Sequence, residues 1–142
     1  MVTEPIVTEL ARLQTVLDSS PLHRMFELKV TAADVPAQRI TIEMPFGIAT
    51  ARDDKSQQFH GGAIASLIDI AGDFALIAVL GYGVPTINFR VDYLRAAMAP
   101  KLLATAQVQR AGKSVGVVDI SVADADGKVV ALGRGCYSTR AG

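Results

Sequence analysis

The stretch that decides the fold runs from His60 to Leu80 and reads HGGAIASLIDIAGDFALIAVL. Fourteen of residues 63–80 are apolar, and they do not alternate with polar residues as those of a half-buried strand would. The run stops at Gly81, and Pro85 follows shortly after; both residue types end helices. We therefore predict one helix over residues 60–81, about 30 Å long at about 1.5 Å per residue and buried nearly all round.

The segments outside this helix carry strand patterns. Apolar and polar residues alternate over residues 26–31, 39–44, 86–93, 102–110 and 115–123, and residues 128–138 close the chain. Short turns join the last strands, at Gly112-Lys113-Ser114 and at Asp124–Gly127.

One more helix is expected near the N-terminus, within residues 1–20. Ile6, Leu10, Leu13 and Leu17 recur at helical spacing, and Pro21 ends the pattern. The order of elements predicts an α+β domain over residues 1–142, in which one antiparallel sheet wraps around the long central helix.

Composition excludes several classes of function. The 142 residues include 14 basic and 14 acidic side chains, so a formal net charge of +0 predicts neither a nucleic-acid partner nor binding to an anionic membrane. Asp69 and Asp73 interrupt the most apolar run, which argues against a membrane span. Cys136 is the only cysteine and there are two histidines, which argues against a structural zinc site. The first twenty residues lack the apolar core of a signal peptide, so we expect a cytoplasmic protein.

The polar residues of the central helix form a narrow stripe. Ser66, Asp69 and Asp73 lie at positions i, i+3 and i+7, on one face of a helix whose interior contains no Arg, Lys or His. A carboxylate among apolar side chains is unfavourable unless it is paired or has a function. Asp69 therefore either faces a solvated groove, or pairs with an arginine such as Arg90 or Arg95, or carries chemistry. In the last case Asp73 would raise its pKa by like-charge repulsion.

The start of the helix is a second candidate site. Gly61 and Gly62 allow a ligand to approach the backbone closely, and the first N–H groups of a helix are unpaired and lie at the positive end of its dipole. A carbonyl oxygen bound there would be polarised as in an oxyanion hole. The two glycines could equally serve only close packing. His60 is expected to make a hydrogen bond at the helix start rather than to act as a metal ligand or base.

These residues carry a family resemblance. Residues 60–69, HGGAIASLID, closely resemble the central-helix motif of hotdog-fold acyl-CoA thioesterases of the phenylacetic-acid-degradation (PaaI-like) type. Residues 85–95 look like the strand that follows this helix in the family. Residues 110–114 and 126–128 resemble its last hairpins. The similarity extends over roughly residues 38–138, and the spacing from the His-Gly-Gly segment to Asp69 is its most specific part.

The resemblance implies an enzyme that hydrolyses an aryl- or acyl-CoA thioester. Asp69 matches the catalytic carboxylate, which acts either as nucleophile or as general base, and Gly61 matches the residue whose backbone N–H polarises the thioester carbonyl. Thr86 matches a hydroxyl position that helps to hold the attacking water. Asp73 takes a position that bears a small hydroxyl residue in some members. In such families the site lies across a dimer interface, often within a dimer of dimers.

The resemblance also indicates how the substrate is held. The CoA phosphates require cations at the mouth of the site, and Arg95, Arg110 and Lys113 are the candidates. The remaining expected substrate-binding residues are His60, Gly62, Gln58, Asp73 and Ser114. The reaction needs no metal and no cofactor, because coenzyme A is part of the substrate.

One position departs from the family pattern. Six residues before the histidine, where the family often has Asn or Gln to orient the water or the carboxylate, this chain has Asp54. Either Asp54 acts as a second acid near Asp69 and changes its pKa, or Gln57 or Gln58 takes the amide role. This departure slightly favours an alternative function, a non-catalytic hotdog module that binds acyl-CoA or a related acyl ligand. The intact spacing from His60 to Asp69 favours the enzyme.

Overall fold

The computed structural model describes residues 3–140 of the chain. The elements follow in the order α1 (Thr3–Leu17), α2 (Pro21–Met25), β1 (Lys29–Asp34), β2 (Arg39–Pro45), α3 (Gly61–Leu80), β3 (Thr86–Tyr93), β4 (Lys101–Ala111), β5 (Val115–Asp124) and β6 (Val129–Ser138). The N-terminal helix, the central helix and all six strands were expected from the sequence, whereas α2 was not.

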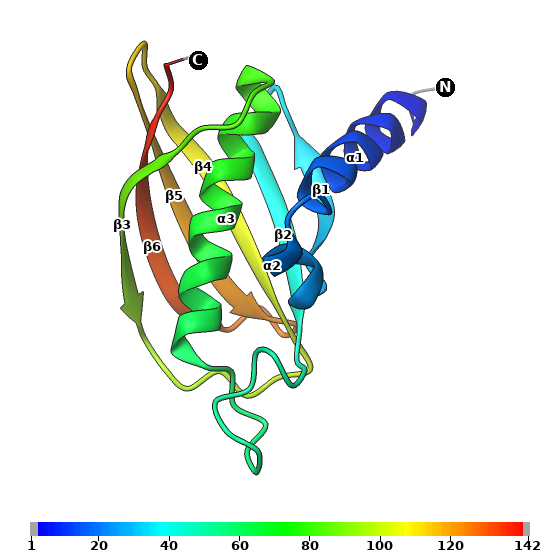
Figure 1. The fold of residues 1–142 in the computed structure, drawn as a ribbon, viewed down its shortest axis with the longest axis vertical. Coiled ribbons are helices and arrows are strands. Elements are labelled where there is room, and N and C mark those ends of the chain that lie inside the picture. The colour runs from blue at the N-terminus through cyan, green and yellow to red at the C-terminus, as the bar shows by residue number, and fades with distance from the viewer. Residues whose placement is uncertain (1–2, 141–142) are drawn as a thin grey trace.

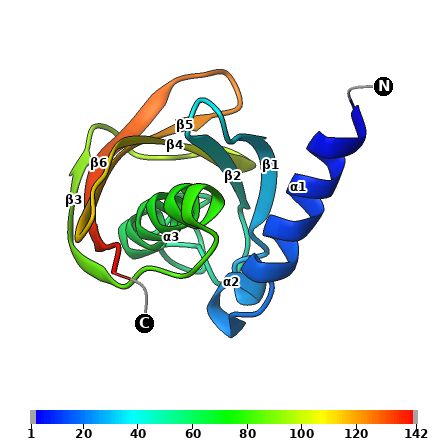
Figure 2. The ribbon, with the colours of Figure 1, turned by 90° about the horizontal axis from the view of Figure 1, so that it is seen from above.

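The six strands form a single antiparallel sheet with the order β1-β2-β4-β5-β6-β3. The sheet curls around α3, which lies along its inner face, and α1 lies outside this layer beside β1 (Figures 1 and 2). This is the hotdog architecture, so the predicted α+β fold with one sheet wrapped around a central helix is confirmed.

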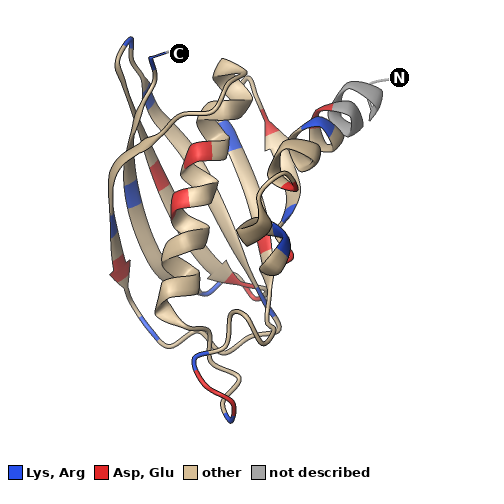
Figure 3. Cartoon of the chain, in the orientation of Figure 1, with Lys and Arg blue, Asp and Glu red and all other residues tan. Residues whose placement is uncertain are grey.

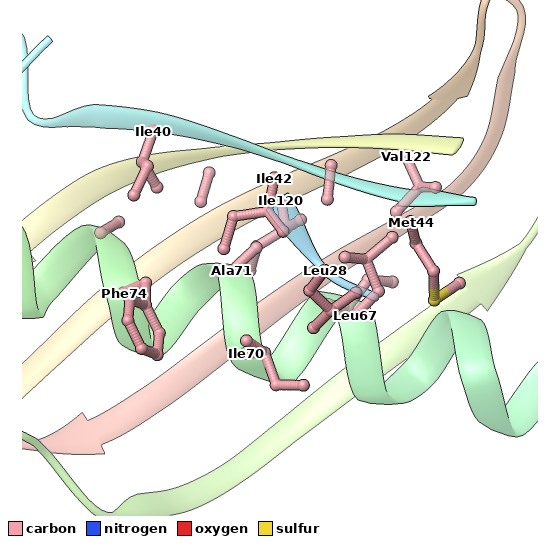
Figure 4. Packing of buried hydrophobic residues seen from close by; sticks show 14 of the residues in the cluster. Leu28, Ile40, Ile42, Met44, Leu67, Ile70, Ala71, Phe74, Ile120 and Val122 are labelled. Atoms are coloured by element: carbon pink, nitrogen blue, oxygen red, sulfur yellow. The ribbon is translucent and has the colours of Figure 1, made fainter. Parts of the chain in front are cut away.

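The core lies between α3 and the inner face of the sheet. Alternating residues of β2, β4 and β5 point inward and are buried, as the sequence pattern predicted. Figure 4 shows α3 side chains meeting those of the sheet, with Leu67, Ala71, Phe74, Ile40, Ile42, Met44, Ile120 and Val122 among the labelled residues. Because strands β2 to β6 all contact α3, most of its apolar residues are buried by the fold of a single chain.

The apolar character of α3 is accounted for by this position. By length and composition alone the helix could cross a membrane, since its mean hydropathy over an 18-residue window is 2.1. In the fold, 61% of that window is buried. The hydropathy of Gly61–Leu80 therefore follows from its place in the core.

Both ends of α3 lie where the sequence predicted them. His60 is the N-cap, with extended backbone angles (φ −65°, ψ 135°), and its side chain accepts a hydrogen bond from the helix. Gly81 is the C-cap and has a left-handed backbone (φ 86°) that a residue with a Cβ adopts only with strain. Local sequence therefore sets the length of the helix.

The short helix α2 corrects the prediction for residues 21–28. Pro21 was interpreted only as the end of the first helix, but it occupies the first turn of a new one, where its missing N–H is not needed. The first strand consequently begins at Lys29 instead of residue 26. Phe26 and Leu28 are nevertheless buried, as the alternation indicated.

The β1 edge of the sheet is closed by α1. The side-chain amide of Gln14 pairs with the edge strand as another backbone would: its Oε1 accepts from the Val30 N–H at 2.7 Å, and its Nε2 donates to the Leu28 carbonyl at 3.1 Å. An edge strand with free N–H and C=O groups is a template for pairing with another chain. Gln14 satisfies two of these backbone groups, and α1 lies beside this edge.

The β3 edge is open. None of the residues of β3 is buried, and the apolar side chains of Ile87 and Tyr93 are 55% and 53% exposed. Phe89 on the same strand and Leu94 just beyond it are also exposed. An edge strand whose outer side is unpaired and that exposes this much apolar surface is typical of an interface.

We predict that Gln14→Ala lowers the free energy of unfolding by about 1–3 kcal/mol, because it leaves the Val30 N–H and the Leu28 carbonyl without their partner. Thr15→Ala is the matched control, since Thr15 is exposed and its hydroxyl bonds only within α1. The control should change stability by no more than about 0.5 kcal/mol. Urea denaturation of both variants measures the difference, and equal stabilities would contradict the role assigned to Gln14.

Candidate active site

One face of α3 is left uncovered by the sheet. Gly62 is exposed, and Ala65, Ser66, Asp69 and Asp73 are half-buried, whereas the remaining residues between positions 63 and 77 are buried. The two charged residues of α3, both acidic, are these two half-buried aspartates (red on α3 in Figure 3). The predicted polar stripe is confirmed, and it coincides with the part of the helix that a single chain does not bury.

Asp69 is held by a hydroxyl group rather than by a cation. The Thr86 Oγ1 on β3 donates to Asp69 Oδ1 at 2.7 Å. Among residues 3–140 no ion pair includes Asp69, and Arg90, one of the expected partners, lies 3.3 Å from Asp92 instead. Of the predicted site residues, Asp69 and Thr86 are thus brought together directly.

Asp73 lies one turn further along α3 in a more enclosed environment. Its Oδ1 is buried and has no hydrogen-bond partner among the described residues. Burial raises the pKa of Asp73 to about 7, the backbone N–H of Val84 opposes this rise, and the charge of Asp69 adds to it. Within residues 3–140, no third His, Cys, Asp or Glu joins the two carboxylates as a potential metal ligand.

The start of α3 offers a free backbone donor. The His60 Nδ1 accepts from the Gly62 N–H at 2.8 Å, which confirms the hydrogen-bonding role expected for this histidine. The Gly61 N–H has no acceptor among residues 3–140. As the first residue of the helix, Gly61 presents this N–H at the positive end of the dipole.

A cavity of 360 Å³ opens beside this donor. Its lining residues are Gln58, Phe59, Gly61, Ile64, Tyr93, Leu94, Arg95, Ala96 and Ala97. The Tyr93 hydroxyl donates to the Gly61 carbonyl at 2.6 Å and fixes the peptide that follows the free N–H. Of the predicted site residues, Gln58, Gly61 and Arg95 share this cavity.

The polar loop before the helix places its candidate residues differently. Asp54 is exposed, in a turn closed by the backbone N–H groups of Lys55 and Ser56 donating to the Asp53 carboxylate. Gln57 is exposed too. Only Gln58 lines the cavity beside Gly61, where its Oε1 accepts from Arg52 at 3.3 Å. The arrangement in one chain favours Gln58 over Asp54 for the amide role.

Three predicted substrate-binding residues lie elsewhere. Arg110, Lys113 and Ser114 surround the turn between β4 and β5, at the end of the molecule opposite the start of α3 (Figure 1). They line a second cavity of 360 Å³. The Ser114 Oγ accepts from the Arg140 Nε at 3.2 Å. A single chain therefore does not bring them together with Arg95 and Gly61.

Sequence reasoning missed two tyrosines that contact the site. Tyr93 was noted only as part of an alternating strand, yet it bonds to Gly61. Tyr137 was not singled out, yet its hydroxyl donates to the backbone carbonyl of Asp69 at 3.0 Å. The one available signal for Tyr137 was its position two residues after Gly135, which leaves room for a large ring on the inner face of β6.

Comparison with known proteins agrees with this fold. Residues 58–131 match the family model of the thioesterase superfamily. Acyl-coenzyme A thioesterase PaaI of Escherichia coli is 33% identical over 119 residues, which cover 80% of this chain and 84% of that protein. The solved structure of E. coli PaaI superposes with a TM-score of 0.80 at 26% identity, and the match covers 95% of each chain.

A second relative matches more closely over a shorter region. A protein of Halobacterium salinarum with a provisional esterase name is 44% identical over 88 residues, which span 55% of this chain and 58% of that relative. The chain belongs to the thioesterase superfamily. Within that superfamily it is a hotdog thioesterase of the PaaI-like type.

The environment of Asp73 predicts how stability depends on pH. Since the pKa of Asp73 is 3.8 ordinarily and about 7 in the fold, between pH 4 and 7 the folded protein holds a proton that the unfolded chain has released. The free energy of unfolding should therefore fall as the pH rises through this window. Asp73→Asn removes the titration, so its stability relative to the unmodified protein should increase by roughly 1–4 kcal/mol from about pH 4 to about pH 8.

Urea denaturation at the two pH values measures this difference. Asp126→Asn serves as control, because Asp126 is exposed in the turn between β5 and β6. Its stability should follow that of the unmodified protein. If Asp73→Asn and the unmodified protein respond to pH in parallel, the proton assigned to Asp73 is not there.

Proposed function

We propose that this protein is an acyl-CoA thioesterase in which Asp69 is the catalytic carboxylate and the Gly61 N–H polarises the thioester carbonyl. The observation that carries the proposal is the Asp69 carboxylate itself, bonded to Thr86 at 2.7 Å on the single uncovered face of a buried helix. A carboxylate in that position is unfavourable for folding and is expected to have a function. The similarity to E. coli PaaI, named an acyl-coenzyme A thioesterase, supports the substrate class.

The two chemical groups act from different subunits in this proposal. Gly61 and Asp69 are eight residues apart on one helix, which separates them by about 12 Å along its axis at about 1.5 Å per residue. One thioester carbonyl cannot contact both within one chain. In a second copy with its α3 antiparallel to the first, Asp69 of that copy would face Gly61 of this one.

The open edge of the sheet supports such a dimer. Gln14 satisfies backbone groups at the start of β1, whereas β3 is exposed and carries the apolar side chains of Ile87 and Tyr93. We propose that two copies join along β3. In this dimer each copy covers the face of α3 that the other leaves uncovered. An isologous contact of this kind places two identical sites at one interface.

Substrate binding follows from the same arrangement. With the two α3 helices antiparallel, the β4–β5 turn of the second copy would lie beside Gly61 and Arg95 of the first. This turn holds Arg110, Lys113 and Ser114. The cations would then bind the phosphates of CoA. Gln58, His60 and Gly62 border the thioester end, and the acyl group would lie along the apolar side of α3.

The reaction is the addition of water across the thioester bond. The carbonyl carbon gains an oxygen, either from water activated by Asp69 or from the Asp69 carboxylate itself, in which case water then cleaves the resulting anhydride. The carbon–sulfur bond breaks, and the coenzyme A sulfur leaves with the electron pair and takes up the released proton. The Gly61 N–H stabilises the negative charge that develops on the carbonyl oxygen.

Replacement of the carboxylate tests the enzyme directly. We expect Asp69→Asn to lower the rate of thiol release from acyl- and aryl-CoA substrates by about 10²–10⁴-fold, because the amide neither attacks nor accepts a proton. Binding of the same CoA esters should persist, measured by calorimetry, and Asp126→Asn should leave the rate unchanged. Thioester binding without turnover by the unmodified protein would instead identify a non-catalytic acyl-CoA module.

Mixing two inactive variants tests the shared site. Gly61→Pro removes the proposed N–H donor but suits the first helical position, since His60 already has the extended backbone that precedes proline. This variant should lose about 10²–10³-fold in rate. When Gly61→Pro and Asp69→Asn chains are unfolded and refolded together, half of the dimers are mixed and each has one intact site, so about a quarter of the original activity should return.

Each variant refolded alone is the control for this experiment and should stay inactive. A lack of recovery in the mixture, with mixed dimers detected by native mass spectrometry, would place both groups within one chain. That result would contradict the shared site.

A further inference from the structure

All three tyrosines of the chain donate their hydroxyl to a backbone carbonyl. Tyr82 bonds to Thr139 at 2.6 Å, Tyr93 bonds to Gly61 at 2.6 Å, and Tyr137 bonds to Asp69 at 3.0 Å. The proposed function does not use Tyr137, although its partner is the residue that carries the catalytic carboxylate.

The Tyr137 hydroxyl is fixed by packing. The residue is 0% exposed, and its ring lies against two glycines, one on α3 and one on β6. A Cβ at Gly72 or at Gly135 would overlap the Tyr137 hydroxyl oxygen. Burial raises the pKa of Tyr137 above its ordinary value, and the charges of Asp69 and Asp73 raise it further, so the hydroxyl stays protonated and remains a donor.

The strand register connects this hydrogen bond to the one on the carboxylate. Tyr137 on β6 is the direct partner of Thr86 on β3, and Thr86 donates to Asp69 Oδ1. One pair of facing residues therefore holds Asp69 at two atoms, its backbone oxygen and its carboxylate oxygen. Within the helix the same backbone oxygen is positioned to accept from the Asp73 N–H, so the Tyr137 bond is additional to helix formation.

We propose that Tyr137 is a positioning residue for Asp69. Its hydroxyl sets how far α3 is rotated and displaced against the β3–β6 pair, and thereby keeps the Asp69 carboxylate within reach of Thr86 and of the reacting carbonyl. Tyr137 itself is buried and does not contact the substrate. The inference rests on the proposed role of Asp69.

Tyr137→Phe tests the inference because it removes one oxygen atom and keeps the ring between the glycines. We expect kcat for thioester hydrolysis to fall about tenfold while KM stays within about twofold, since a displaced catalytic group slows the reaction more than it weakens binding. Tyr82→Phe is the matched control: it deletes an equivalent bond to a backbone carbonyl at the far end of α3 and should leave kcat unchanged.

A double variant separates positioning from general stability. In the Asp69→Asn background, Tyr137→Phe should cause no further loss of residual activity, because the group that it positions is gone. The inference is overturned if Tyr137→Phe retains full kcat, if Tyr82→Phe lowers kcat equally, or if Tyr137→Phe fails to fold while Tyr82→Phe folds.

A second readout does not depend on turnover. In protein labelled with ¹³C at the aspartate carboxyl groups, the Asp69 resonance is identified by its absence in Asp69→Asn. Tyr137→Phe should shift this resonance, and Tyr82→Phe should not. If the unmodified protein has no thioesterase activity but Tyr137→Phe still shifts the Asp69 resonance, the proposed function is contradicted and the positioning role is supported. If activity depends on Asp69 but Tyr137→Phe does not shift the Asp69 resonance, the proposed function is supported and the positioning role is contradicted.

Discussion

A 20-residue apolar helix has to be covered on every side, and one curled sheet covers only part of it. The remaining features of the structure follow from this constraint on α3. Burial of Leu67, Ala71 and their neighbours against the strands requires the sheet to wrap around the helix. The face that stays uncovered holds Gly62, Asp69 and Asp73, and the exposed edge strand β3 lies beside it. Polar chemistry and incomplete burial therefore occur at the same place.

The uncovered face gives its two carboxylates different surroundings although they are one helical turn apart. Asp69 reaches across to a hydroxyl on β3, whereas Asp73 has a buried oxygen without a partner and a pKa raised to about 7. Burial and the absence of a partner for one oxygen therefore distinguish Asp73 from its neighbour on the helix. In our proposal only Asp69 reacts, and a second copy of the chain brings Gly61 opposite to it.

Much of the fold could be predicted because its signals are local. The alternation of residues 39–44 and 102–110 gave the buried faces of β2 and β4 correctly, since side chains alternate across any strand. The same local reasoning was wrong at Pro21, because proline both ends one helix and suits the start of the next. It also left Arg90 as a possible partner of Asp69, and the structure pairs Arg90 with Asp92.

By itself the sequence determined the central helix, its caps at His60 and Gly81, and the stripe that carries Asp69, because each depends on residues within a few positions of one another. Only the tertiary structure decided what holds Asp69. Thr86 lies 17 residues away and Tyr137 lies 68 residues away, and both reach it through the pairing of β3 with β6. Strand register and packing against glycines set these contacts, and neither leaves a pattern in the residues around Asp69.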